Sequence, residues 1–176
     1  MYEDSVGIPM TLSGPGIEPS INATPVSLTD LSATIEHAVH GEVSGVESSW
    51  QGRPLQEFID NTDTERPVLS EYHDGGSPCG FFMLRKGRWK YVYFSEGHPS
   101  LLFDIENDPR ELVNLAADEA HATILAELRN QLLQILDPEE VNRQAFSDQA
   151  KMIETLGGIE AIMALPSFNH TPIERG

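Results

Sequence analysis

Glu71 and His73 are the side chains whose types and spacing best fit a binding role. They fall at the carboxyl end of a predicted strand, residues 66–72, and lead into a glycine-rich loop at Gly75 and Gly76. In open α/β sheets, ligands collect at such strand ends. A carboxylate there holds a cation and an imidazole donates to an anion, whereas the alternative is a glutamate and a histidine on an ordinary loop. Glu71 and His73 are therefore the substrate-binding candidates.

Two other patterns resemble metal sites but have simpler explanations. His37 and His40 lie three residues apart on a predicted helix, but no third ligand is near, and histidines suit the dipole of a helix C-terminus. Residues 104–108 match a calcium loop for five residues without the glycine and distal glutamate of that motif. An acidic turn before Pro109 explains this run better. No metal ligand is predicted in this chain.

Nucleophilic chemistry has little support. Cys79 has no flanking base and fits a small buried thiol. Four positive charges cluster in the predicted hairpin: Arg85, Lys86, Arg88 and Lys90. They either make a patch that binds an anion or pair with the excess carboxylates of this chain, and we favour the pairing. The sequence contains no glycine-rich phosphate loop, no Gly-x-Ser-x-Gly elbow and no complete triad. No catalytic residue is predicted.

The elements before residue 75 follow from hydrophobic periodicity. Alternating apolar residues predict a strand over residues 5–12, at a sheet edge because Pro9 cannot donate to a ladder. A helix is predicted from an N-cap at Ser27 to a stop at Gly41, and one helical turn near residues 55–59. The apolar residues of the helix share one face: Leu28, Leu31, Ile35, Ala38 and Val39.

The second half predicts a compact sheet followed by helices. Strands over residues 81–85, 89–94 and 100–104 have short glycine-containing links, which predicts an antiparallel meander. Helices are predicted over residues 121–136, from Pro138 to Leu156, and over 159–165, with an extended tail after them. The second of these helices is expected to expose Val141, Phe146, Ile153 and Leu156.

Composition restricts the class of protein. The 176 residues suit one domain with a core, and 39% hydrophobic with 22% charged residues exclude intrinsic disorder. No apolar stretch is long enough for a transmembrane helix. Eleven Lys and Arg against 28 Asp and Glu give a net charge of −17, which disfavours nucleic-acid partners. The acidic start lacks the features of a signal peptide, so a cytoplasmic location without a membrane partner is expected.

Ordered segments of the chain resemble the C-terminal third of the sulfatases, in the alkaline phosphatase superfamily. The resemblance is strongest to choline-sulfatase-like hydrolases. The matching segments are Met1–Pro9, Gly14–Gly16, Pro25–Leu31, Gly52–Leu55, Ser70–His73, Met83–Tyr91 and Leu102–Leu112. Their order and spacing agree with the family from residue 1 to about residue 120, and residues from Asp137 onward are similar to a C-terminal extension of the choline-sulfatase-like group.

The resemblance implies an α/β fold in three parts. Residues 1–75 would be an incomplete piece of the sulfatase mixed sheet, and residues 76–136 a small antiparallel sheet with a packed helix. Residues 137–176 would be a helical and extended tail. In the family, a preceding domain carries the Cys-x-Pro-x-Arg motif whose cysteine becomes formylglycine, the ligands of a divalent metal, usually calcium, and a catalytic lysine just upstream of the Met-Tyr-Glu segment.

This sequence departs from the family at informative places. Gly80 and Phe81 follow Cys79, so Cys79 does not match the formylglycine motif. Gly7 replaces a commonly basic residue, and residues 32–34 lack the usual Pro-Thr. The resemblance therefore implies a C-terminal fragment of a sulfuric ester hydrolase, inactive alone, with Met1 an internal methionine of a longer enzyme. The alternatives are a non-catalytic interaction or oligomerisation module, or a fragment of a phosphonate monoester or phosphodiester hydrolase.

The resemblance also implies partners for the full-length enzyme. These are a small sulfate ester as substrate and further copies of the same chain, in a homo-oligomer that the tail helps to form. A choline-like head group has a fixed positive charge, which Glu71 would attract with the help of an aromatic face. His73 would lie nearer the ester oxygen as a hydrogen-bond donor.

Overall fold

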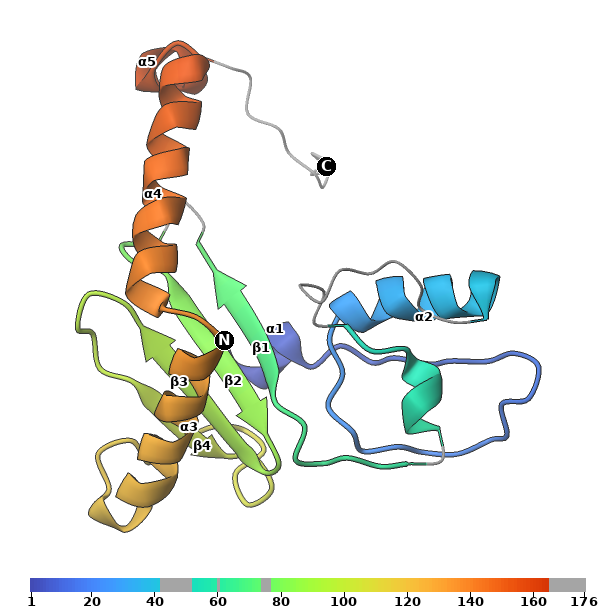
Figure 1. The fold of residues 1–176 in the computed structure, drawn as a ribbon. Helices are drawn as coiled ribbons and strands as arrows, with labels where there is room; N and C mark the ends of the chain where they lie inside the picture. Colours follow the sequence, from blue (N-terminus) through green and yellow to red (C-terminus); the bar gives the residue numbers. More distant parts are fainter. Residues whose placement is uncertain (42–51, 60, 74–76, 165–176) are drawn as a thin grey trace, which may run out of the picture.

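A four-stranded antiparallel sheet forms the centre of the molecule (Figure 1). The computed structural model describes residues 1–41, 52–59, 61–73 and 77–164. The strands pair in the order β1-β2-β3-β4, with bounds β1 Val68–Tyr72, β2 Phe81–Lys86, β3 Trp89–Phe94 and β4 Leu101–Asp104. Gly87 takes φ +53° in the tight link between β2 and β3, a conformation that glycine adopts without strain. The predicted meander is confirmed.

One face of the sheet holds a closed apolar core beneath α3 (Ala122–Ile135). A short 3₁₀ helix, η2 (Glu119–His121), leads into α3. Leu128 and Leu132 point from α3 into the core and are almost completely buried. The sheet contributes Phe82, Leu84, Tyr91 and Leu102. The predicted helix over residues 121–136 is confirmed, and its spacing of three and four is the spacing of this buried stripe.

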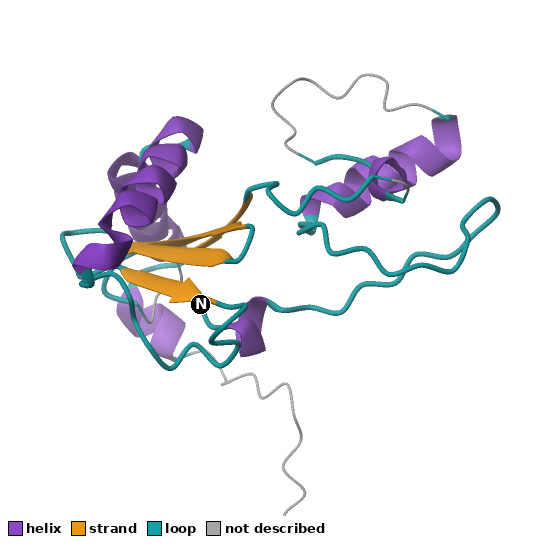
Figure 2. Ribbon diagram, turned by 90° about the horizontal axis from the view of Figure 1, so that it is seen from below, coloured by secondary structure: helices purple, strands orange, loops and turns teal. Residues whose placement is uncertain are grey.

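The other face of the sheet is covered by the start of the chain. Figure 2 shows α1 (Glu3–Val6) and α3 on opposite faces of the sheet. Successive residues of a strand point to opposite faces, so Lys90 faces α1 while Tyr91 faces α3. The ring of Tyr2 packs against Phe103, with centroids 5.9 Å apart.

The predicted strand over residues 5–12 is wrong. The structure has the single helical turn of α1 there, followed by irregular chain, and Ile8 is 60% exposed. Pro9 lacks a backbone donor, which weakens any ladder here, and no strand of the described structure pairs with this segment. The other strand expected in the mixed sheet, β1, pairs antiparallel with β2 as an edge strand. The described residues before Val68 contain no strand.

The helix α2 (Thr29–His40) and the 3₁₀ helix η1 (Leu55–Phe58) pack beside the irregular N-terminal chain. Both predicted helical segments are confirmed, and Gly41 ends α2 at φ +78°. The buried face of α2 carries Asp30, Ala33 and Thr34. The predicted apolar residues do share a face, but that face is exposed. Leu28, Leu31, Ile35 and Val39 are 37–69% exposed and are called the α2 stripe below.

A long helix, α4 (Pro138–Thr155), extends away from the sheet and ends near α5 (Ile159–Met163) (Figure 1). Asp137 caps α4 by accepting hydrogen bonds from the N–H groups of Glu139 and Glu140, and Pro138 occupies its first turn. Gly157 and Gly158 follow α4 at φ +90° and +91°. These features confirm the predicted break and stop.

Exposure along α4 differs in part from the expectation. Leu156 is 52% exposed, but Val141 packs against the sheet core, and Phe146 and Ile153 are half-buried. The extended tail predicted after residue 165 lies outside the described residues. Among the residues described, no helix has the length and apolar content needed to cross a bilayer.

Candidate functional site

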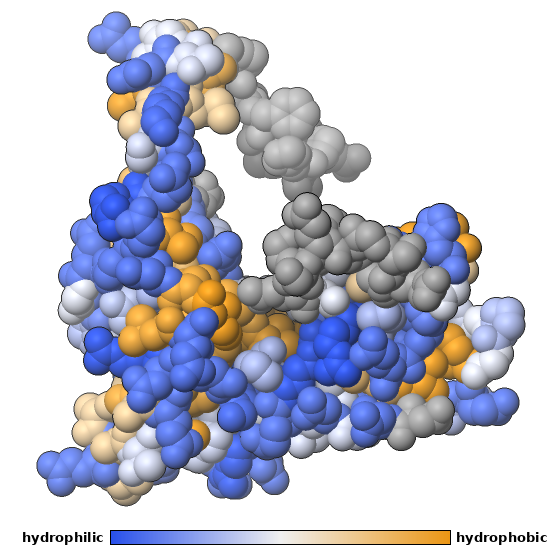
Figure 3. All heavy atoms as spheres, viewed as in Figure 1, coloured by the Kyte–Doolittle hydropathy of each residue, from blue (hydrophilic) through white to orange (hydrophobic). Residues whose placement is uncertain are grey.

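A groove runs between the start of the chain and the edge of the sheet. It encloses about 760 Å³ and is called the α1–β1 groove below. One wall is the segment from Met1 to Met10, and the loop over residues 24–28 closes one side. The sheet wall includes Ser70, Glu71, Tyr72, Phe81, Met83 and Arg85. Figure 3, seen from the side of α3 and α4, shows apolar side chains gathered over the sheet near the start of α4.

Glu71 lies in this groove and is 48% exposed at its side chain. It stands opposite Phe82 in the register of β1 and β2, on the free edge of the sheet. Tyr72 and Phe81 also line the groove and stack with centroids 4.9 Å apart, but they point to the opposite face of the sheet from Glu71, because successive strand residues alternate. The Glu71 carboxylate is thus at the strand edge, on the face that carries Phe82 and His73.

His73 is near Glu71 but does not line the groove. Its Nε2 lies 3.5 Å from a carboxylate oxygen of Glu71, and its side chain is 17% exposed. The ring meets Phe82 edge-on at 5.2 Å between centroids, and the His73 carbonyl accepts a hydrogen bond from the Gln149 side chain of α4. His73 therefore links the end of β1 to α4, and its role toward substrate stays a prediction.

Asn142 fixes α4 against the same end of the sheet. Its Oδ1 accepts a hydrogen bond of 2.6 Å from the Gly80 N–H, and its amide donates to Glu96. Gly80 also lies against the His73 ring, and a Cβ on Gly80 would lie 2.5 Å from His73 Nδ1. This close packing explains why glycine precedes β2.

Buried charges hold the opposite wall of the groove, and their particular partners were not predicted from the sequence. Lys90 Nζ lies 2.7 Å from Glu111 Oε1 and 2.9 Å from Glu3 Oε1. Glu111 Oε2 also accepts a hydrogen bond of 2.6 Å from the Glu3 N–H. One signal was available, because the alternation of β3 puts Lys90 on the same face as the buried Val92, where a lysine needs carboxylates.

A second buried ion pair holds α2. Asp30 is fully buried and accepts from both terminal nitrogens of Arg66, at 2.8 and 2.7 Å. It also accepts from the N–H groups of Ser27 and Arg53. Burial acts to raise the pKa of Asp30, but the Arg66 guanidinium and the two N–H donors outweigh it and hold the pKa below its ordinary value. This pair connects the first turn of α2 to the chain just before β1.

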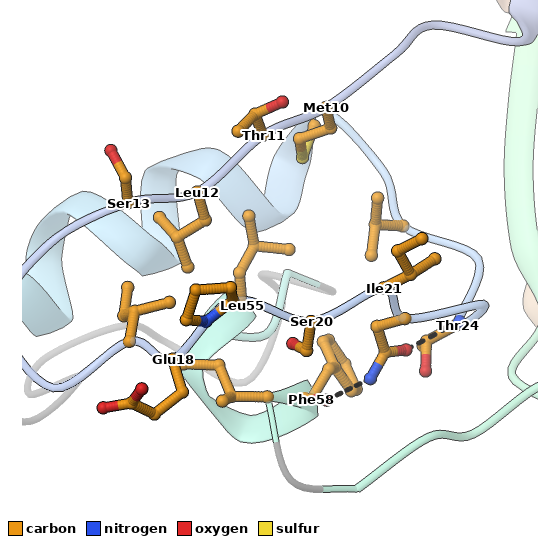
Figure 4. A pocket seen from close by; sticks show the side chains of 15 residues that line it. Met10, Thr11, Leu12, Ser13, Glu18, Ser20, Ile21, Thr24, Leu55 and Phe58 are labelled. Carbon is orange, nitrogen blue, oxygen red and sulfur yellow. Dashed lines mark hydrogen bonds between the residues drawn. The ribbon is translucent and has the colours of Figure 1, made fainter.

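A separate hollow of about 600 Å³ lies between the N-terminal loop and η1 (Figure 4). Leu12, Leu55 and Phe58 line it with mostly apolar surface. Few polar groups face it: Asn22 donates to the Phe58 carbonyl, and Thr24 N–H donates to Asn22 Oδ1. The hollow has no cluster of titratable groups and belongs to the packing of the loop.

The remaining candidates take structural places. Cys79 is 3% exposed, and burial raises the pKa of its thiol. Asp104 closes the predicted acidic turn by accepting from Asn107, and it also pairs with Arg88. Arg88 and Lys90 pair with carboxylates as expected, whereas Arg85 donates to the backbone carbonyls of Gly87 and Trp89. His37 and His40 lie in the last turn of α2.

Comparison with known proteins assigns the family. The family model of the N-sulphoglucosamine sulphohydrolase C-terminal region matches residues 1–138. The chain belongs to this sulfatase C-terminal family. The match ends where α4 begins.

Relatives of this sulfatase C-terminal chain are themselves sulfatases. The choline-sulfatase of Rhizobium meliloti is 34% identical over 134 residues, covering 73% of this chain and 26% of the relative. Arylsulfatase K of Mus musculus is 32% identical over 133 residues, covering 67% of this chain and 23% of the relative. The chain thus spans about a quarter of the length of the curated relatives it matches.

A solved structure shares the fold. The phosphonate monoester hydrolase of Silicibacter pomeroyi superposes with a TM-score of 0.57 at 28% identity, over 69% of this chain and 27% of that chain. This likeness and the family match confirm the expected α/β class.

Sulfatases as a family use a metal and a formylglycine, and neither the sequence around Cys79 nor the described part of the chain fits these groups. Cys79 is followed by Gly80 and Phe81 rather than by the x-Pro-x-Arg of the formylglycine motif. In the part of the chain that the structure describes, no group of three or more His, Cys, Asp or Glu side chains is placed to hold a metal ion. No catalytic step is therefore assigned to residues of this chain.

Proposed function

We propose that this chain is the C-terminal part of a sulfuric ester hydrolase and forms one wall of its substrate site. The nucleophile and the metal ligands would come from the rest of the longer polypeptide. The observation that carries this proposal is the sulfatase C-terminal match over residues 1–138, together with 34% identity to a choline-sulfatase four times as long as the aligned region.

The α2 stripe supports a place within a larger protein. Four large apolar side chains on one helix face are exposed, while the polar Asp30 and Thr34 of the same helix are buried. A helix normally buries its apolar stripe. A catalytic domain packed on α2 would bury the stripe, which explains the inverted pattern.

Glu71 is the proposed contact to substrate. It lies half-exposed on the free edge strand of the sheet that borders the α1–β1 groove. An accessible carboxylate at this place suits the fixed cation of a choline-like ester. The sulfate group would then be directed toward the catalytic domain. His73, 3.5 Å from Glu71, would orient that carboxylate or reach the ester oxygen.

Phosphonate monoester hydrolysis is the second candidate reaction. It is favoured by the structural likeness to the hydrolase of Silicibacter pomeroyi, at 28% identity. Both reactions place negative charge on a group with several oxygens, so the groove itself does not distinguish them.

The tail is proposed to join copies of the full-length enzyme. Met152, Leu156, Ile159 and Met163 are 52–80% exposed at the far end of α4 and on α5. These four residues lie beyond the family match, at the end of α4, which extends away from the sheet, and on α5 (Figure 1). Leu156→Asp should lower the native mass of the assembled enzyme, and an unchanged mass would exclude this surface.

The proposed function is tested with a chimera. This chain replaces the matching C-terminal region of the Rhizobium meliloti choline-sulfatase, and sulfate release is measured from choline sulfate and from an aryl sulfate that has no cationic group. The chimera should turn over both esters and the chain alone neither. A chimera that melts cooperatively but is inactive on both would favour a non-catalytic interaction module. Activity of the chimera on a phosphonate monoester alone would favour the second candidate reaction.

The role of Glu71 is tested in the same chimera. Glu71→Gln should raise KM for choline sulfate with little change in kcat, because the cation is held in the ground state and the transition state alike. Turnover of the aryl sulfate without a cationic group should be unaffected. Glu57→Gln, an exposed change outside the groove, is the matched control. Equal effects on the two esters, or no effect, would remove Glu71 from the site.

A further inference from the structure

We propose that Lys90 and Glu111 are positioning residues that hold the N-terminal wall of the α1–β1 groove at a fixed distance from Glu71. This inference rests on the proposed function, since it assigns the groove to the ester substrate. It adds two residues that touch neither the groove nor the predicted substrate contacts.

Lys90 donates a hydrogen bond to Glu3 and forms an ion pair with Glu111, whose Oε1 has no hydrogen-bond donor among the described residues. Lys90 is 0% exposed and Glu111 2% exposed at their side chains. Glu111 uses one carboxylate oxygen for Lys90 and the other for the Glu3 N–H. Lys90 reaches the carboxylate of Glu3 as well. The backbone and the side chain of Glu3 are thus both held, from positions 87 and 108 residues away in sequence.

The chain bends into a costly conformation to make these contacts. Glu111 has φ +55°, one of two non-glycine residues with positive φ in the described chain. A left-handed conformation is unfavourable for a residue with a Cβ, and such strain persists where the surroundings enforce it. Here it directs a buried carboxylate at Glu3 instead of leaving it in water.

Stability alone does not explain a buried pair of this kind. Removing a cation and a carboxylate from water costs about as much as their attraction returns, and two apolar side chains often serve equally well. Contacts between apolar side chains, unlike hydrogen bonds, do not require a particular angle. The lysine and the carboxylate fix both the height and the rotation of Glu3 above the sheet, because each hydrogen bond has a preferred angle.

The position of Glu3 decides the shape of the groove. Glu3 lies in the wall that runs from Met1 to Met10, and Tyr2 beside it rests on Phe103. The facing wall is the edge of β1 with Glu71. Irregular chain follows α1, so no ladder hydrogen bonds hold this wall in the described structure. The buried charges take the place of a ladder.

The sharpest test replaces both charges at once. Lys90→Met with Glu111→Met leaves no unpaired buried charge, so the chain should still fold cooperatively. In the active chimera, KM for choline sulfate should rise at least tenfold, because the groove wall is no longer held. In the isolated chain, amide exchange at Val6 and Gly7, whose N–H groups close the α1 turn, should accelerate at least tenfold.

A neighbouring ion pair supplies the control. Arg88 and Asp104 pair at the edge of the same sheet but do not contact the N-terminal segment. Arg88→Met with Asp104→Leu should leave KM and the exchange rates at Val6 and Gly7 unchanged.

A Lys90–Glu111 double variant with parental KM and parental exchange would overturn the inference. Altered exchange with parental KM would overturn the assignment of substrate to the groove. An inactive parental chimera would count against the proposed function. Amide exchange at Val6 and Gly7 in the isolated chain would still show whether Lys90 and Glu111 hold the N-terminal wall.

Discussion

The regions before and after Pro67 hold themselves together by different means. The N-terminal unit, the described part of residues 1–66, relies on directed polar contacts: Asp30 pairs with Arg66 inside it, and Glu3 ties it to the buried Lys90 and Glu111 of the sheet unit. The sheet unit, residues 68–136, closes an apolar core between the sheet and α3. Polar contacts specify geometry but contribute modest net stability, whereas apolar burial supplies most of the folding free energy.

The exposed surfaces of the two units agree with this contrast. The N-terminal unit leaves the α2 stripe, Ile8 and Ile21 exposed. The sheet unit leaves mainly Leu112, Val113 and Leu133. The N-terminal unit is thus positioned by polar contacts, while several of its large apolar side chains stay exposed.

The largest effect is expected in the N-terminal unit. Asp30→Asn leaves Arg66 buried without its counter-charge, and breaking a buried pair costs about 3–5 kcal/mol. Chemical unfolding, followed by a probe in each unit, should show the unit around α2 opening first. The control Glu57→Gln removes an exposed pair with Arg53 and should cost less than about 1 kcal/mol. Equal losses for the two variants would contradict the contrast.

A core deletion should weaken the sheet unit by a comparable amount. Leu132→Ala removes a completely buried side chain beneath α3, at an expected cost of about 2–5 kcal/mol in unfolding free energy. Leu133→Ala changes the next residue, which is 50% exposed, and should cost well under half as much. If both variants melted alike, α3 would not be the cover of this core.

Acid should affect the N-terminal unit through Asp30. Its pKa is lowered in the folded state, so its contribution to stability is complete above the unfolded pKa of about 4 and is lost as the pH falls through the folded pKa. Unfolding free energies measured from pH 6 down to pH 2 should fall less steeply for Asp30→Asn than for the parent. Parallel curves would show that Asp30 is not a major source of the acid dependence.

The smallest effect should come from the α2 stripe in the isolated chain. Ile35→Asp changes a side chain that is 65% exposed, so the unfolding free energy should move by less than about 0.5 kcal/mol. In the chimera the same change should lower the melting temperature and the yield of active enzyme. A large loss in the isolated chain, or none in the chimera, would show that the stripe does not face the catalytic domain.

The sequence predicted those elements whose signals are local. The meander, α2, α3 and the Asp137–Pro138 break all carry periodicity or capping signals within a few residues. The strand over residues 5–12 failed because alternation at Val6, Ile8, Met10 and Leu12 reports apolar spacing and not the presence of a partner strand. A ladder needs that partner, which periodicity cannot supply.

The site was harder to predict for the same reason. Glu71 was predicted from its place at a strand end; the structure puts it along a groove, and its role toward substrate stays a prediction. Lys90 was read as a hairpin charge, because its partners Glu3 and Glu111 are distant in sequence. The ring of His73 could not be placed without knowing that α4 returns to this end of the sheet.

The contact between Glu3 and Glu111 also sets an order of events during synthesis. The two residues are 108 positions apart, so at about 5–20 residues per second Glu3 leaves the ribosome roughly 5–20 s before its partner exists. The hairpins of the sheet close over short loops in microseconds. The first ten residues therefore cannot dock through this contact until Glu111 has been made, after the strands of the sheet, and until then they lack their buried partners.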